Sequence, residues 1–109
     1  MKKSFALALL AMSLVAGYSQ TQPESTFKPK DGYVPNAETA VKIAEAVLVP
    51  VYGEKKILSE RPFKATLRED TWTVEGTLPC PAGKHCLGGT AVVMISKTSG
   101  EILRMMHYK

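Results

Sequence analysis

The sequence predicts an α+β domain in which one helix is followed by four consecutive strands. Apolar residues recur with a helical period of about 3.6 residues between Asn36 and Gly53, and with a period of two after Pro62. Turn-forming residues separate the strand segments. Because consecutive strands usually pair as neighbours, we expect a curved, four-stranded antiparallel meander with the N-terminal helix packed on one face.

Residues 1–19 are typical of a secretory signal peptide. Lys2 and Lys3 precede an apolar run of 12 residues, Phe5 to Ala16, and small residues follow this run. A helix needs about 20 apolar residues to cross a bilayer, so we expect a cleaved export signal and no stable membrane anchor. Cleavage is expected between residues 17 and 20, which predicts a soluble protein exported to the periplasm.

The rest of the chain is predicted to form a polar leader and one domain. Residues 20–32 show no apolar period and are expected to be flexible, whereas residues 33–109 are enough for one small domain with a single core. The net charge is +4, and Lys2 and Lys3 contribute half of it. Because the remaining basic residues are spread along the chain, the sequence does not indicate nucleic-acid binding.

The predicted helix begins after Asn36, whose side-chain oxygen is expected to cap the first free amides. Pro50 cannot donate a hydrogen bond to the carbonyl of Ala46, so we expect the helix to kink or stop at Val49, and to end at Gly53 at the latest. The apolar face of the helix is predicted to consist of Ala40, Ile43, Ala44, Val47, Leu48 and Val51.

A connecting turn from Glu54 to Pro62, with Ile57 and Leu58 pointing inward, is predicted to lead into the first hairpin. Glu69 and Asp70 are expected to form the turn of this hairpin, and alternate residues of each strand to point inward. These inward residues are Phe63, Ala65 and Leu67 in the first strand and Trp72, Val74, Gly76 and Leu78 in the second.

The last two strands are predicted to be joined by the turn Lys97–Glu101, with Gly100 in the left-handed region. This turn sets the register of the hairpin. The expected pairs are Ile95 with Leu103 and Val93 with Met105 on the core face, and Met94 with Arg104 and Val92 with Met106 on the opposite face.

Cys80 and Cys86 are predicted to form a disulfide, because an exported chain meets an oxidising compartment. The loop that they close joins the second and third predicted strands. A zinc site that combines both cysteines with His85 and His107 is the alternative, but the spacing matches no paired-ligand zinc pattern, and we predict no metal site.

The inventory of reactive residues does not favour an enzyme. Nucleophilic catalysis needs a nucleophile, a base and a group that orients the base, and the spacing of residues indicates no such set. Glycine-rich phosphate loops and metalloprotease motifs are also absent from the sequence. Four acids are interpreted as surface residues: Glu60, Glu69, Asp70 and Glu75. We therefore expect neither catalytic residues nor cofactors.

A partner-binding surface is predicted instead, in two parts. Lys84 and His85 are expected at the tip of the cysteine loop, and Met94, Arg104 and Met106 on the sheet face opposite the helix. Adaptable apolar residues on an otherwise polar face often mark partner surfaces. The alternative is that the sheet curls and that this face lines a small second core.

Seven short segments follow one another along the chain with a characteristic spacing. They are Gly32–Ala40, Ile43–Ala46, Val51–Glu54, Pro62–Ala65, Trp72–Leu78, Gly88–Ala91 and Gly100–Arg104. In this order they resemble small bacterial immunity proteins with the nuclear-transport-factor-2-like fold. The resemblance implies a shortened, cone-like version of that fold, and a protein that neutralises a cognate toxin protein by stoichiometric binding. The cysteine loop departs from the family pattern as an elaboration.

Two other functions remain open. The segment from Ser96 to Leu103 is also similar to the end of PepSY modules, which implies an exported regulator of a protease. A small ligand could instead bind between helix and sheet, with Trp72 and Tyr52 as stacking walls, although Trp72 is also the expected kind of core residue.

Overall fold

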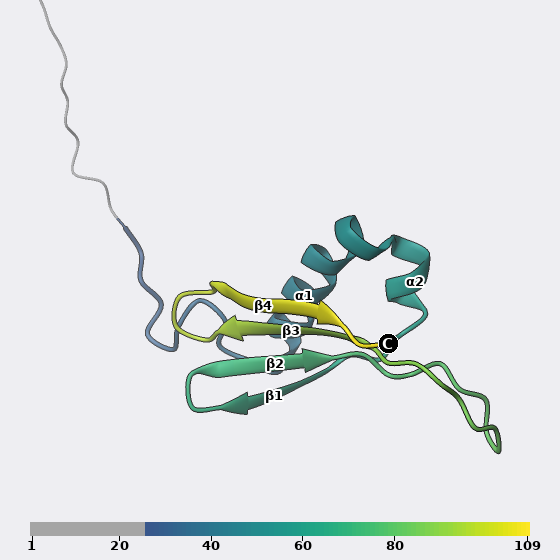
Figure 1. Ribbon diagram of the computed structural model, residues 1–109. Helices are drawn as coiled ribbons and strands as arrows, with labels where there is room; N and C mark the ends of the chain where they lie inside the picture. Colours follow the sequence, from purple (N-terminus) through teal and green to yellow (C-terminus); the bar gives the residue numbers. More distant parts are fainter. Residues whose placement is uncertain (1–25) are drawn as a thin grey trace, which may run out of the picture.

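The computed structural model describes residues 26–109, so the predicted signal peptide and residues 20–25 of the predicted leader lie outside the described part. The elements are α1 (Ala37–Tyr52), α2 (Glu54–Leu58), β1 (Lys64–Arg68), β2 (Thr71–Glu75), β3 (Ala91–Ser96) and β4 (Ile102–His107). The strands form one antiparallel sheet in the order β1-β2-β3-β4, with both helices on one side (Figure 1). The predicted α+β meander is confirmed. Within residues 26–109, no helix has the length and apolarity needed to cross a membrane.

Helix α1 begins and packs largely as its sequence predicts. The Asn36 side-chain oxygen accepts a hydrogen bond from the Thr39 amide at 2.8 Å, which confirms the predicted cap. Residues at intervals of four, Ala40, Ala44 and Leu48, are fully buried. The expected burial of Val51 is wrong, because this side chain is 59% exposed. The next residue of the four-residue series is Tyr52, which is half-buried instead.

Pro50 does not end α1 at Val49, contrary to one of the two expected outcomes. Proline removes a single helical hydrogen bond here, the one to the carbonyl of Ala46. Ala46 is exposed, so water can satisfy its carbonyl, and the helix continues to Tyr52. Gly53 then ends the helix as predicted, with a φ of 98° and its amide donating to the Val49 carbonyl at 2.8 Å.

One hydrophobic core lies between α1 and the sheet. Trp72 is buried in it, and its indole N–H donates to the carbonyl of Val34 at 2.8 Å, so it is a core residue and not an exposed stacking wall. The predicted connecting turn after Gly53 contains the short helix α2, which buries Ile57 as expected. The core consists of Val34, Ala40, Ala44, Leu48, Ile57, Phe63, Trp72, Val74, Ala91, Val93 and Ile95.

The register of the β3–β4 hairpin differs from the predicted one at a single place. Val93 lies opposite Met105, Met94 opposite Arg104 and Val92 opposite Met106, as expected. Ile95, however, pairs with Ile102 and not with Leu103, and a register shift follows between Met94 and Ile95. Gly100 has the predicted left-handed φ of 78°. The chain therefore absorbs Leu103 as an extra residue in a bulge, which leaves it 49% exposed.

The first hairpin turns at Glu69 and Asp70 as predicted, and Leu67 lies opposite Trp72. The expected inward alternation holds at Phe63, which is buried, but Leu67 is exposed. Leu67 lies near the end of β1, and β1 is an edge strand with a neighbouring strand, β2, on one side only.

Residues at the predicted boundary between leader and domain also contact the sheet. The amides of Tyr33 and Val34 donate to the carbonyls of Thr98 and Lys97 in the β3–β4 turn. Gly32 packs so closely on this turn that a Cβ atom would lie 2.4 Å from the Lys97 carbonyl oxygen. The segment before α1 is therefore fixed to the end of the sheet.

Asp70 joins the two hairpin turns at this end. Its carboxylate accepts hydrogen bonds from the hydroxyls of Thr98 at 2.6 Å and Ser96 at 3.1 Å. The Thr98 hydroxyl, above all, holds the pKa of Asp70 below its ordinary range; the Ser96 hydroxyl, the Thr98 amide and the charge of Lys97 act in the same direction. The ionised form of Asp70 is thus the form that the folded protein prefers.

Replacing Asp70 with asparagine is expected to lower the melting temperature by a few degrees at neutral pH. A carboxylate with a lowered pKa stabilises the fold above its unfolded-state pKa, and loses this contribution as the pH falls through the folded-state value. The difference between wild type and Asp70→Asn should therefore shrink below about pH 4. Thermal unfolding monitored by circular dichroism at several pH values measures it. Glu69→Gln is the control, and an equal loss of stability in that variant would contradict the role of Asp70.

Candidate partner-binding surface

The sheet face opposite the helices, here called the open face, is built from side chains in regular cross-strand rows. One row consists of Lys64, Glu75, Val92 and Met106, and the next of Thr66, Thr73, Met94 and Arg104. The residues from β1 and β2 are polar or charged, whereas those from β3 and β4 are mostly apolar. The open face therefore has a polar half and an apolar half.

The apolar half of the open face brings together three of the predicted partner-binding residues. Met94 lies directly opposite Arg104, and Met106 opposite Val92. Met94 and Met106 are half-buried, Arg104 is exposed, and Val92 is only 7% exposed because its neighbours cover it. None of the four belongs to the core cluster on the helix side. A methionine pair beside an arginine forms an adaptable apolar surface with a charged rim.

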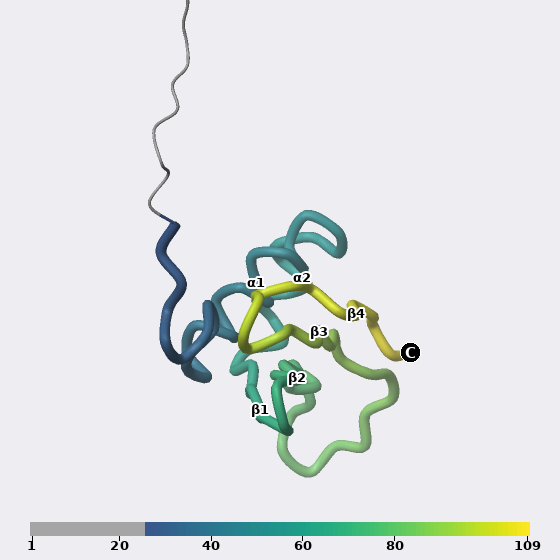
Figure 2. The backbone as a smooth tube through the Cα atoms, turned by 90° about the vertical axis from the view of Figure 1, so that its left-hand side faces the viewer, coloured from purple at the N-terminus to yellow at the C-terminus, as the bar shows by residue number. Residues whose placement is uncertain are grey.

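The loop between β2 and β3 carries the other two predicted residues. It extends beyond the end of the sheet in Figure 1 and away from the helices in Figure 2. Lys84 and His85 are exposed in it, as predicted. The structure thus places the predicted site in two separate groups, one on the loop and one on the open face.

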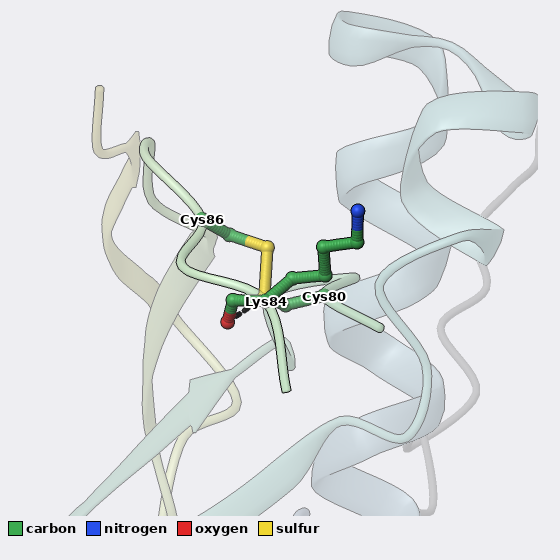
Figure 3. Close-up of a disulfide and its surroundings, with 3 residues drawn as sticks. All are labelled: Cys80, Lys84 and Cys86. Atoms are coloured by element: carbon green, nitrogen blue, oxygen red, sulfur yellow. Dashed lines mark hydrogen bonds between the residues drawn. A yellow bond between two sulfur atoms is a disulfide. The ribbon is translucent and has the colours of Figure 1, made fainter. Parts of the chain in front are cut away.

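The predicted disulfide between Cys80 and Cys86 is present, with a distance of 5.8 Å between the Cα atoms. The sulfur of Cys80 lies 3.3 Å from the carbonyl oxygen of Lys84, while the Lys84 side chain extends away from the disulfide (Figure 3). Since the cysteines are bonded to each other, they cannot be the thiolate ligands of the alternative zinc site. Among residues 26–109, no three acidic, histidine or cysteine side chains gather in a way that would hold a metal ion.

Removal of the disulfide is expected to have a moderate effect on stability. Closing so short a loop contributes about 2 to 2.5 kcal/mol in the chain-entropy model. We expect the Cys80→Ser/Cys86→Ser variant to remain folded and to unfold at a lower urea concentration than the oxidised wild type. Reduced wild type is the matched control and should behave like the variant. An unchanged urea midpoint in both would contradict the predicted contribution.

Sequence reasoning missed an exposed anchor on the loop. Leu87 follows Cys86 and is 92% exposed, the largest exposed fraction among the large apolar side chains of the described residues. An exposed leucine beside a disulfide is a candidate contact residue, because the crosslink limits the conformational freedom that binding would cost. Leu87 is an apolar residue in a loop that has no apolar periodicity, and this pattern could have indicated that its side chain is exposed.

Sequence reasoning also assigned Glu60 wrongly. This acid was interpreted as a surface residue, yet it is 2% exposed and lies between α2 and the sheet. Its Oε2 atom is 2.8 Å from Nε2 of His107, near the end of β4. Its Oε1 atom accepts a hydrogen bond from the Ala91 amide at 2.8 Å. The partners are 47 and 31 positions away in the chain, so no local pattern could have revealed the pair.

Concave regions of the described residues lie outside the open face, and two of them adjoin the sheet. A groove of about 740 Å³ runs between α1 and β1, with Val41, Phe63 and Ala65 among its lining residues. At its rim, Arg61 donates two hydrogen bonds to the carboxylate of Glu45, at 2.8 and 2.9 Å. A smaller cavity of about 390 Å³ lies beside His107, between α2 and the base of the disulfide loop.

The fold and the surface together define a small α+β domain that presents a sheet face and a crosslinked loop. The family model described as "NTF2 fold immunity protein" matches residues 39–109, which include all six elements except the first two residues of α1. The chain belongs to this family. The matched region also includes Ser96–Leu103, the segment on which the resemblance to PepSY modules is based.

Two curated relatives come from Escherichia coli (strain K12). The uncharacterized protein YhhH is 32% identical over 76 residues, which are 70% of this chain and 58% of that protein. The uncharacterized protein YbbC is 34% identical over 71 residues, which are 64% of this chain and 55% of that protein. This chain therefore spans a little more than half the length of these relatives. No solved structure gives a significant match.

Proposed function

We propose that this protein is a periplasmic immunity protein that neutralises a cognate toxin protein by stoichiometric binding. Membership of the family supports immunity as the general role. Export is supported by the sequence of residues 1–19 and by the disulfide, since disulfides persist in oxidising compartments. The toxin would then act in the periplasm, on the cell wall or the membrane.

The apolar half of the open face is the observation that supports binding most directly. Met94, opposite Arg104, and Met106, opposite Val92, stand in two cross-strand rows of the open face, and none of the four belongs to the core cluster. Methionine adapts to irregular partner surfaces, and arginine is enriched among the residues that dominate binding energy. Lys84, His85 and Leu87 on the disulfide loop are the second proposed contact region.

The arrangement of the reactive groups favours binding over chemistry. In His107, Nε2 contacts the Glu60 carboxylate and Nδ1 lies 2.7 Å from the carbonyl oxygen of Tyr108. Neither ring nitrogen is therefore free to act as a general base on a substrate. Both cysteines are oxidised, so neither supplies a thiolate nucleophile.

The test begins with the tagged mature protein, purified from the periplasm of its own host under oxidising conditions, and with mass spectrometry of the bound proteins. A captured protein counts as the toxin only if its expression in the periplasm kills cells and co-expression of this protein protects them. Light scattering of the purified pair should then give a complex of one toxin to one immunity protein. A captured protease whose activity changes on binding, without toxicity, would contradict immunity and favour the PepSY-like function.

A further inference from the structure

Glu60 is placed where it holds both ends of the disulfide loop. Its backbone carbonyl accepts a hydrogen bond from the amide of Thr77, just after β2, at 2.7 Å. Its Oε1 atom accepts from the amide of Ala91, the first residue of β3, at 2.8 Å. The segment between these two amides contains Cys80 and Cys86. One residue after α2 therefore fixes the start and the end of the loop.

Glu60 is closely packed on the side that faces Gly76. A Cβ atom on Gly76 would lie 2.8 Å from Oε1 of Glu60, so only glycine fits beside the carboxylate. Gly76 in turn donates its amide to the carbonyl of Ala91 at 3.0 Å. Because the Glu60 side chain is almost fully buried, its charge needs a partner inside the protein. His107 is that partner.

Opposite an ionised Glu60, His107 satisfies both of its contacts only in its protonated form. Nε2 lies 2.8 Å from Oε2 of Glu60, and Nδ1 lies 2.7 Å from the carbonyl oxygen of Tyr108. Carboxylate and carbonyl oxygens accept hydrogen bonds and cannot donate them. A neutral imidazole carries a single N–H, so one of its nitrogens would direct a lone pair at an oxygen. The imidazolium donates to both.

The contact with Tyr108 leads back to the disulfide loop. The Tyr108 amide donates to the carbonyl of Thr90 at 3.1 Å, and Thr90 is the last residue before β3. The same end of the loop is thus held twice, by Glu60 through Ala91 and by His107 through Tyr108. Because the Glu60 carboxylate is a stronger acceptor than a carbonyl, a neutral His107 would keep its N–H on Nε2. The lone pair of Nδ1 would then face the Tyr108 carbonyl and push this backbone away from the ring.

Other charged and aromatic groups surround the pair. Lys56 from α2 and Lys109 from the C-terminal residues line the cavity next to His107, and the Tyr52 ring at the end of α1 lies 5.4 Å from the imidazole ring. The wall of this cavity on the loop side includes Leu87. A change in the protonation of His107 therefore occurs at the same cavity that Leu87 of the disulfide loop lines.

We propose that Glu60 and His107 are positioning residues for the disulfide loop, and that the proton on His107 acts as a switch that holds the loop base closed. Protonated His107 fixes Tyr108 and Thr90, whereas loss of the proton loosens the end of the loop. The imidazolium can donate to both oxygens and the neutral ring to only one, so the closed loop is favoured as the pH falls. That the loop contacts a toxin rests on the proposed function; the switch itself does not.

Amide hydrogen exchange of the oxidised mature protein tests the switch without any partner. The reporters are the amides of Thr77, Ala91 and Tyr108, and their protection factors are corrected for the intrinsic pH dependence of exchange. We expect protection of Ala91 and Tyr108 to fall about tenfold between pH ~5.5 and ~8.5, because hydrogen bonds to or from charged groups are the stronger ones. The amide of Val93, in the centre of the sheet, should not change. Nitrogen-15 spectra of the His107 ring should show the imidazolium wherever protection is high.

The matched variants are Glu60→Gln and Glu75→Gln. A glutamine at position 60 can accept from the Ala91 amide and donate to a neutral Nε2, which leaves Nδ1–H for the Tyr108 carbonyl. Nδ1 then carries an N–H whether or not Nε2 is protonated, so protection of the Tyr108 amide in Glu60→Gln should become independent of pH. Glu75→Gln, on the open face, should keep the wild-type pH dependence.

The inference is overturned if the amides of Ala91 and Tyr108 keep the same protection in wild type at both pH values, or if they are fully protected while the ring is neutral. These two observations use wild-type protein, so they decide the question even if Glu60→Gln does not fold. A pH-dependent loop in a protein that binds no toxin would contradict the proposed function alone. Toxin binding with a pH-independent loop would contradict the switch alone.

Discussion

Replacing Leu48 with alanine is expected to lower the free energy of unfolding by about 3 to 5 kcal/mol. Leu48 is fully buried on the face of α1 that packs against the sheet, and it is among the largest fully buried side chains of the described residues. Its truncation removes apolar burial and leaves a cavity in a close-packed core. Small domains are stable by only about 5 to 15 kcal/mol, so the variant should be close to unfolding. Urea denaturation followed by Trp72 fluorescence measures the loss.

Val51→Ala is the matched control for this prediction. Val51 lies on the same helix but is 59% exposed, so its replacement should change stability by no more than about 0.5 kcal/mol. A large loss in Val51→Ala, or a small one in Leu48→Ala, would contradict the described packing of α1 on the sheet.

Replacing Met94 with glutamate is expected to weaken toxin binding by about 100-fold or more while the domain stays folded. Met94 lies on the open face opposite Arg104, outside the core cluster, so the added carboxylate remains in water in the free protein. In the complex the same carboxylate would have to leave water for an apolar contact, and it would compete with the toxin for the Arg104 guanidinium opposite it, which is costly. Calorimetry of the toxin complex measures the affinity, and circular dichroism verifies the fold.

The same variant decides between the two interpretations of the open face. Thr66→Glu is the control, since Thr66 stands in the same cross-strand row on β1 and receives the same charge. We expect Thr66→Glu to bind nearly as well as wild type. Unfolding of Met94→Glu would instead indicate that Met94 belongs to a second core, as the alternative interpretation holds.

Most of the fold could be predicted because its signals are local. The cap at Asn36, the stop at Gly53 and the left-handed Gly100 each depend on a few neighbouring residues. The alternation in β2 and β3 gave the correct core face, and the turn chemistry gave three of the four predicted pairs of the last hairpin. The fourth pair failed because a bulge inserts one residue, Leu103, and a period-two pattern carries no signal of where an insertion lies.

What could not be predicted depends on contacts between distant parts of the chain. Whether Pro50 stops a helix depends on the solvation of the carbonyl four residues earlier, which only the packing of α1 determines. The burial of Glu60 depends on His107 and Ala91, from strands much later in the chain. Acids near helix ends are usually exposed, so composition and spacing favoured the wrong assignment. The disulfide was predictable because compartment and cysteine count restrict the pairing to one choice.

The central claim, that the protein binds its toxin through the open face, is tested most directly by the methionine methyl groups. Three of the five methionines lie beyond the predicted signal peptide: Met94 and Met106 on the open face, and Met105 opposite Val93 on the core face. Titration of carbon-13 methyl-labelled mature protein with the purified toxin should shift or broaden the Met94 and Met106 resonances, saturating at one equivalent, and leave Met105 nearly unchanged. A saturating complex that shifts Met105 alone, or none of the three, would contradict binding through the open face.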